Sequence, residues 1–185
     1  MKPLWVLAIA PGKLAYGSSG VGSTFHLMGE AIKQAGGVDI LHVPYKGVIQ
    51  AVQDTATGQI QMTLSNVTNV LPFYKSGKVK ILAVNESRRY PGLPDVPTVV
   101  EAMPGLQMPD SWFGLFGPAA LPRPVLDRLN GSMVQALRAP EVRTRLEQMG
   151  NFVAGNSPEE FAAVIRKTSD AYTRIVQRAG IKPED

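Results

Sequence analysis

Cysteine is absent from all 185 residues, and histidine occurs only twice. Without cysteine the chain has no disulfide, no thiolate ligand for a metal and no cysteine nucleophile, although an oxidising compartment is not excluded. There is also no His/Asp/Glu cluster at metal-ligand spacing and no G-x-S-x-G motif. These absences argue against a metal centre and a serine hydrolase, and we expect no cofactor.

The chain also lacks a strong charge and a long apolar run. Its net charge of +4 comes from 19 basic and 15 acidic residues, which suits small anions or an ordinary surface but is too thinly spread to indicate nucleic acid. No run reaches the length of a bilayer span. Residues 1–11 begin like a secretory signal, but Pro11 and Gly12 follow a short apolar stretch, so we predict a helix or strand fragment and no convincing signal peptide.

The first part of the chain alternates strand and helix patterns. Glycine at positions 58 and 77 ends two of the helical stretches, and the last strand pattern, VKILAV, is a nearly continuous apolar run typical of a buried parallel strand. The pattern predicts an α/β fold with a mostly parallel sheet and right-handed crossovers. We expect strands at residues 14–16, 40–43, 60–64 and 79–84, and helices at 24–35, 48–57 and from 67 to before Gly77.

Composition changes after residue 90. Five prolines between residues 91 and 109 predict an irregular connector with at most a short helix at 98–102. Ser157 and Glu160 form a capping-box pattern with proline at the first helical position. We predict a strand at 111–117 and helices at 124–138, 141–149 and 158–179, which gives a self-contained lobe at residues 12–110 and a partial lobe at 111–185.

Small polar residues follow each of the first three predicted strands. In a parallel sheet, ligands bind outside the carboxyl ends of the strands, and a helix that begins there offers unpaired N–H groups to an anion. The three loops together supply backbone donors, hydroxyls, one amide and one ammonium. The candidate ligand-binding residues are Ser18, Ser19, Gly20, Gly22, Ser23, Thr24, Tyr45, Lys46, Gly47, Ser65 and Asn66.

Other interpretations of the first loop are weaker. Gly17 and Gly22 have P-loop spacing, but Ser23 stands where that motif needs lysine, and Phe25 breaks a dinucleotide fingerprint that starts at Gly20. A turn before a capped helix, without any ligand, stays open as an alternative. His26 and His42 are predicted to be packed or hydrogen-bonded, and not to lie over the loop serines.

Several segments, in order, resemble one family. They are YGSSGVGSTFHLMGE, HVPYKG, LPDVPTVVEAMPG, SWFGLFGPAALP, PEVRTRLEQMG and SPEEFAAVIR. Together they resemble the Bug or TctC family of extracytoplasmic solute-binding proteins, which serve tripartite tricarboxylate transporters. The resemblance implies a periplasmic-binding-protein type II-like (Venus flytrap) fold that closes on a small carboxylate. It also implies a periplasmic protein that delivers this solute to the membrane subunits of a transporter, without catalysis.

The resemblance also assigns roles to loop residues. It implies that the loop from Ser18 to Thr24 cradles a carboxylate and that Tyr45, Lys46 and Gly47 contact the ligand. Ser65 stands where the family commonly has aspartate before a polar residue, so a more anionic solute is expected here.

Family members resemble a chain with a signal peptide and a further half-lobe before the equivalent of Pro11. We therefore expect a shortened form, with one complete lobe and part of another, whose exposed sheet edge and apolar faces favour a homodimer or strand-exchanged oligomer. Two alternatives remain: an α/β enzyme acting on a small phosphorylated or carboxylated metabolite, and a remnant without solute binding.

Overall fold

The computed structural model describes residues 12–106, 108–109 and 111–182. The fragment predicted at residues 1–11 lies outside these residues. The chain divides into two compact units, one from Ser111 to Ser169 and one that joins the first 110 residues to the chain from Asp170 onward. Each unit is described by itself.

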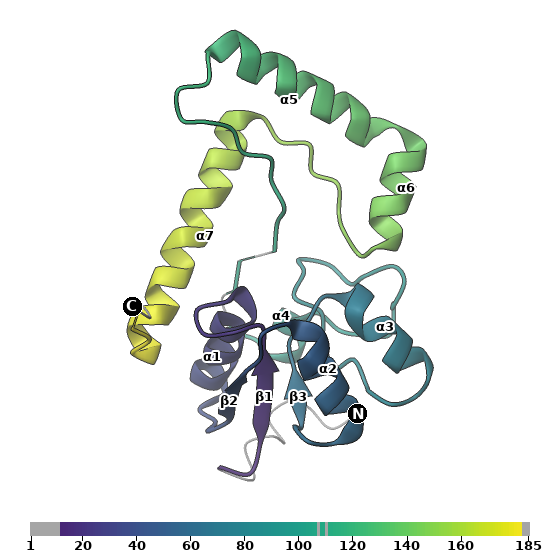
Figure 1. Ribbon diagram of the computed structural model, residues 1–185, viewed down its shortest axis with the longest axis vertical. Helices are drawn as coiled ribbons and strands as arrows, with labels where there is room; N and C mark the ends of the chain where they lie inside the picture. Colours follow the sequence, from purple (N-terminus) through teal and green to yellow (C-terminus); the bar gives the residue numbers. More distant parts are fainter. Residues whose placement is uncertain (1–11, 107, 110, 183–185) are drawn as a thin grey trace. The chain divides into compact units, whose positions relative to one another are not determined.

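The first unit contains a three-stranded parallel sheet, as the alternating pattern predicts (Figure 1). Its strands are β1 (Ala15–Ser18), β2 (Leu41–Pro44) and β3 (Met62–Thr63), in the order β2-β1-β3. Tyr16 pairs with His42 on one side and with Met62 on the other. The central strand β1 therefore ends between the loops that follow β2 and β3.

Three helices follow these strands: α1 (Thr24–Gly36), α2 (Val48–Thr57) and α3 (Val67–Lys75). The first two end at glycines in the left-handed conformation, Gly37 and Gly58, where a side chain would be strained. The sequence predicted these helices to within one or two residues.

Helices α1 and α2 pack on opposite faces of β1. Gly29 of α1 lies against the Tyr16 ring, and a Cβ on Gly17 would come within 2.7 Å of Ala51 on α2. Successive side chains of a strand point to opposite faces, so Tyr16 and Ser18 share the α1 face while Gly17 faces α2. Glycine at positions 17 and 29 is what permits this close packing.

The predicted fourth strand, residues 79–84, is wrong. Leu82 is 42% exposed, and only Val84 makes a bridge, with Thr98. Val84 donates its N–H to the Pro97 carbonyl at 3.0 Å and accepts from the Val99 N–H at 2.8 Å. Within the described residues this run has no neighbouring strand to extend the pairing, so its apolar character alone did not produce a buried strand.

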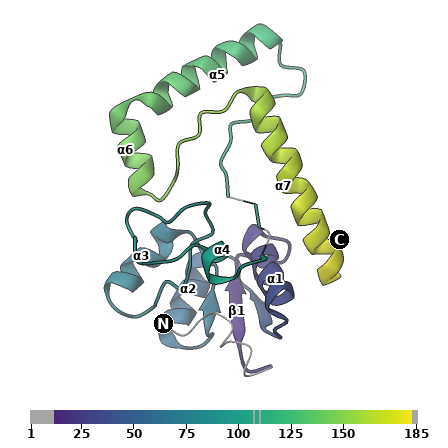
Figure 2. The same cartoon turned by 180° about the vertical axis from the view of Figure 1, so that it is seen from behind.

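The proline-rich connector contains the expected short helix, α4 (Val99–Ala102), visible in Figure 2. Thr98 and Glu101 form a reciprocal capping box: the Glu101 N–H donates to the Thr98 hydroxyl, and the Thr98 N–H donates to the Glu101 carboxylate. A small core forms beside it from Val84, Tyr90, Leu93 and Val96.

The C-terminal part of α7 (Pro158–Ala179) belongs to the first unit. Ile175 packs with Leu27 and Ala31 of α1 and with Leu106, and Tyr172 and Val176 lie around this cluster. The Gln34 side chain donates to the Ile175 carbonyl at 3.3 Å. The apolar residues near the end of this helix therefore pack against α1.

The second unit consists of α5 (Arg123–Arg138), α6 (Pro140–Gln148) and the start of α7, all close to their predicted bounds. The capping box is confirmed, because the Glu160 N–H donates to the Ser157 hydroxyl at 3.1 Å. The strand predicted at 111–117 is wrong: the segment is irregular. Trp112 anchors it by donating to the Thr168 hydroxyl at 3.1 Å.

Candidate functional site

The carboxyl ends of the three strands bring three helix N-termini to one edge of the sheet. Ser23, Gly47 and Asn66 are the N-cap residues of α1, α2 and α3. The loops are also joined at their starts, because the Tyr45 N–H donates to the Ser18 carbonyl at 3.1 Å. The structure therefore gathers the predicted residues at one edge, where the N–H groups and dipoles of three helices favour an anion.

The loop from Ser18 to Ser23, here called the glycine loop, is held by hydrogen bonds within the protein. The Gly20 N–H donates to the Ser18 hydroxyl at 3.2 Å, and the Gly22 N–H donates to Nδ1 of His26 at 3.0 Å. Both glycines have positive φ, 119° and 73°, which side-chain-bearing residues rarely adopt. These two N–H groups were expected to face a ligand, but both already donate hydrogen bonds within the protein.

Donors remain at the start of α1. The Ser23 hydroxyl accepts from the His26 N–H at 3.2 Å and so caps the third residue of the helix. Among the described residues, the N–H groups of Thr24 and Phe25 have no protein acceptor. The side chain of Ser19 is half-buried and Thr24 is exposed. An anion at this helix end would meet these two N–H groups first.

In the second loop, the Tyr45 side chain is directed away from the strand ends. Its hydroxyl donates to Oδ2 of Asp54, one turn and a half into α2, at 2.8 Å. Partial burial and this hydrogen bond raise the pKa of Tyr45 to about 12. Lys46 is exposed, and Gly47 begins α2 without a side-chain cap. Of the three residues, Lys46 and the backbone of Gly47 are thus best placed to receive a ligand.

The third loop is open. Asn66 is exposed and does not cap α3 with its side chain. The Ser65 hydroxyl makes only a long contact, 3.4 Å, to the Asn66 carbonyl. The amide and the hydroxyl are therefore available to a ligand.

The placement of the histidines corrects the sequence analysis. His42 lies with Nε2 2.6 Å from the Ser18 hydroxyl oxygen, so a histidine does contact a loop serine. The pairing of Tyr16 with His42 puts the imidazole on the same face of the sheet as Ser18. His26 stacks on His42 with ring centroids 3.9 Å apart and planes 11° apart. The prediction that both rings are packed or hydrogen-bonded is confirmed.

A buried carboxylate completes this cluster, and sequence reasoning missed it. Glu30 accepts hydrogen bonds from the Tyr16 hydroxyl and from Lys33, both at 2.9 Å, and Nε2 of His26 lies 4.0 Å away. Burial, and then the Glu30 charge, raise the pKa of Tyr16 well above its usual range. The i, i+4 spacing of His26 and Glu30 was the available signal.

The cluster is not arranged for nucleophilic catalysis. Ser18 has 0% exposure, so a substrate does not reach its hydroxyl. That hydroxyl is also bonded to both the N–H and the carbonyl of Gly20. Its role is to hold the glycine loop.

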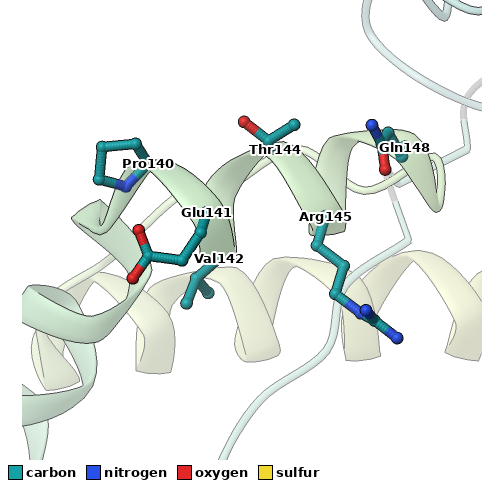
Figure 3. Close-up of a pocket in the computed structure, with 6 residues that line it drawn as sticks. All are labelled: Pro140, Glu141, Val142, Thr144, Arg145 and Gln148. Carbon is teal, nitrogen blue, oxygen red and sulfur yellow. The ribbon is translucent and has the colours of Figure 1, made fainter.

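The part of the chain that the structure describes contains no group of three side chains that could hold a metal ion, and none of its helices is long and apolar enough to cross a membrane. A surface hollow is present on α6, in the second unit, and none of the predicted residues lines it (Figure 3). It is lined by one helix alone, through Pro140, Glu141, Val142, Thr144, Arg145 and Gln148.

Comparison with curated sequences finds relatives of two lengths. The chain is 35% identical over 168 residues to the UPF0065 protein in the tcbD-tcbE intergenic region of Pseudomonas sp. strain P51; the match covers 90% of this chain but only 50% of that protein. A UPF0065 protein in the clcB-clcD intergenic region of Pseudomonas knackmussii is 31% identical, with 85% of this chain and 94% of that protein covered.

Solved structures share the fold at similar identity. A protein described as a periplasmic transporter has a TM-score of 0.82 and 39% identity, with 96% of this chain and 59% of that chain covered. The structure of R. palustris Rpa4515 with adipate has a TM-score of 0.83 and 30% identity, with 97% of this chain and 60% of that chain covered. The structure of MatC from Rhodopseudomonas palustris with bound malate has a TM-score of 0.69 and 30% identity, with 88% of this chain and 56% of that chain covered.

A further solved structure, described as the periplasmic binding protein BugD, has a TM-score of 0.76 and 31% identity, with 97% of this chain and 60% of that chain covered, which confirms the predicted fold class. The family profile that matches, over residues 4–181, is described as TctC, tripartite tricarboxylate transporter family receptor. The chain therefore belongs to the TctC family of tripartite tricarboxylate transporter receptors, as its motifs indicated.

Proposed function

We propose that this chain binds a small carboxylate at the edge where α1, α2 and α3 begin, as a solute-binding module and not an enzyme. The observation that carries the proposal is the convergence of three helix N-termini, with Lys46 beside one of them. Similar structures are named with adipate and malate, both dicarboxylates. A dianion suits an edge that supplies N–H donors and one ammonium but no described carboxylate among its loop residues.

The proposed contacts differ from those that the glycines alone suggested. One carboxylate group would accept from the N–H groups of Thr24 and Phe25, while Ser19, Ser65 and Asn66 supply side-chain donors. Lys46 would balance the second charge. A contact of this kind contributes on the order of 0.3–2 kcal/mol, so two or three of them total about 1–6 kcal/mol, and the roughly 4 kcal/mol of millimolar affinity needs contacts near the strong end of the range.

Ser65 is the residue that would select for charge. The family commonly has aspartate at this position, and with serine the edge lacks that negative charge. This favours dianions over monoanions. Replacing Ser65 with Asp should weaken dicarboxylate binding more than monocarboxylate binding. An unchanged ranking of the two classes would contradict this role.

The test is calorimetric titration with mono-, di- and tricarboxylates. We expect a dicarboxylate to bind, and Lys46→Ala to weaken it on the order of fivefold by removing one exposed charge contact. Lys75→Ala is the matched control, because Lys75 lies in the last turn of α3, at the opposite end of that helix. No binding at millimolar ligand, or equal losses in the two variants, would defeat the proposal.

The wider role rests on the family. We propose that residues 12–110 act as a ligand-binding lobe on which the end of α7 packs, that the rest of 111–185 belongs to a second, partial lobe, and that the protein works in the periplasm with membrane subunits of a transporter. A partner copy is also proposed. It would cover the exposed side chains of residues 113–116 in the second unit, or pair with an outer edge of the sheet, at β2 or β3, in the first.

A further inference from the structure

The two histidines lie directly behind the glycine loop and hold it at two points. His26 accepts the Gly22 N–H, and His42 is hydrogen-bonded to Ser18, whose hydroxyl in turn accepts the Gly20 N–H. Every loop glycine with positive φ is thus connected to an imidazole, directly or through one serine.

The hydrogen bonds fix the protonation state of His26. An N–H can donate only to a ring nitrogen that carries no proton, so Nδ1 is unprotonated and the ring proton is on Nε2. That nitrogen faces the Glu30 carboxylate at 4.0 Å. In this state His26 is neutral and serves Gly22 as an acceptor.

A second proton on His26 would remove this support. The new N–H on Nδ1 would face the Gly22 N–H, two donors with no acceptor between them. If both rings were charged, they would also repel each other across a centroid distance of 3.9 Å. The loop would then have to move away from the ring.

The surrounding groups decide how readily this happens. Glu30 and Lys33 face the pair from α1, and the Tyr16 ring stacks on His42 from β1 at 4.9 Å. Burial lowers the pKa of His26, with Glu30 opposing and Lys33 adding to it. Burial and then His26 lower the pKa of His42 to about 4. The pair is thus neutral near neutral pH and gains charge only in acid.

We propose that the stacked His26–His42 pair positions the glycine loop for ligand only while both rings are uncharged, so that acid releases the loop and the bound carboxylate. The inference rests on the proposed function only for its ligand step. The positioning step stands on contacts inside the protein and is tested without ligand.

The loop itself is followed by NMR in the ligand-free protein. Between about pH 7.5 and 4.5, the Gly22 amide resonance should shift with the same midpoint as the His26 ring. His26→Asn keeps an acceptor near Nδ1 but carries no charge, and should flatten this curve. A Gly22 resonance that stays fixed while His26 titrates would overturn the inference, provided that circular dichroism shows the fold intact.

The ligand step is measured with adipate as the probe. Between about pH 7.5 and 4.5, the affinity of each protein for adipate is measured. The fall should be at least about fivefold larger for the unmodified protein than for His26→Asn. Protonation of adipate itself cancels, because both proteins meet the same ligand. Equal falls would overturn the release step. If neither adipate nor any other carboxylate of the titrated series binds either protein at any pH, the proposed function fails, and the Gly22 resonance still decides whether the pair positions the loop.

Discussion

Nε2 of His42 lies 2.6 Å from the hydroxyl oxygen of Ser18, which joins an edge strand to the end of the central strand. The same hydroxyl accepts the Gly20 N–H at 3.2 Å. A buried serine thereby links the sheet to the loop that is proposed to bind ligand. Both stability and binding should depend on this link.

Ser18→Ala should destabilise the protein by about 1–3 kcal/mol, because it leaves the Gly20 N–H and the His42 ring without their buried partner. The measurement is urea unfolding at neutral pH. Ser19→Ala is the control, since Ser19 is half-buried and its hydroxyl bonds to no other described residue. Equal effects of the two changes would show that the Ser18 contacts contribute nothing specific.

Gly29→Ala should also destabilise strongly, because a Cβ at this position overlaps the Tyr16 ring. Overpacking of a buried site costs about 1–3 kcal/mol. Gly131 on α5 offers a matched control: a Cβ there meets nothing within 4 Å. Gly131→Ala should raise stability by roughly 0.5–1 kcal/mol through helix propensity. Thermal unfolding of both variants checks the opposite signs.

Acid should weaken the fold through His42. In the unfolded chain its pKa is 6.5 and in the folded protein about 4, so between these values the unfolded state binds more protons. The contribution of His42 to the free energy of unfolding is then fully present above about pH 6.5, and it is lost as the pH drops toward 4. One pKa unit corresponds to about 1.4 kcal/mol, and for a half-buried ring we expect a loss on the order of 1–2 kcal/mol.

Urea unfolding at a series of pH values measures this loss. His42→Asn should reduce the slope in this window, although His26, whose pKa is also lowered, leaves part of it. A slope unchanged by the substitution would mean that His42 does not titrate as described.

Self-association should depend on the irregular segment 111–117. Phe113 and Leu115 are 81% and 67% exposed, and replacing both with Ser should shift the protein toward monomer in light scattering. Val100→Ser, a change at another exposed apolar residue, 55% exposed on α4, should leave the distribution unchanged. A monomer before any change would rule out the proposed partner copy.

The sequence predicted the helices well because their ends carry local signals. Ser23, Gly58 and the Ser157 capping box each mark a boundary within a residue or two of the observed one. The apolar runs at 79–84 and 111–117 were less informative. A strand needs a neighbouring strand to pair with, and a run of apolar residues does not say whether one is present.

The sequence predicted that the three loops meet at one edge of the sheet, but it did not predict the hydrogen bonds that hold them there. The order of strand, loop and helix was enough to place Lys46, Asn66 and the glycine loop at one edge. The contact between Ser18 and His42 depends on the register of β1 and β2, which residues so far apart in sequence do not reveal. Glu30 was missed because its burial depends on Tyr16, a residue of another element.

The most direct test of the account is to add adipate to isotopically labelled protein at neutral pH and map the amide resonances that move. We predict that the shifts concentrate on Thr24, Phe25 and the residues that begin α2 and α3, and that Lys46→Ala weakens them. Shifts confined to Glu141, Arg145 and the rest of the α6 hollow, or none at millimolar adipate, would contradict a carboxylate site at the edge of the sheet.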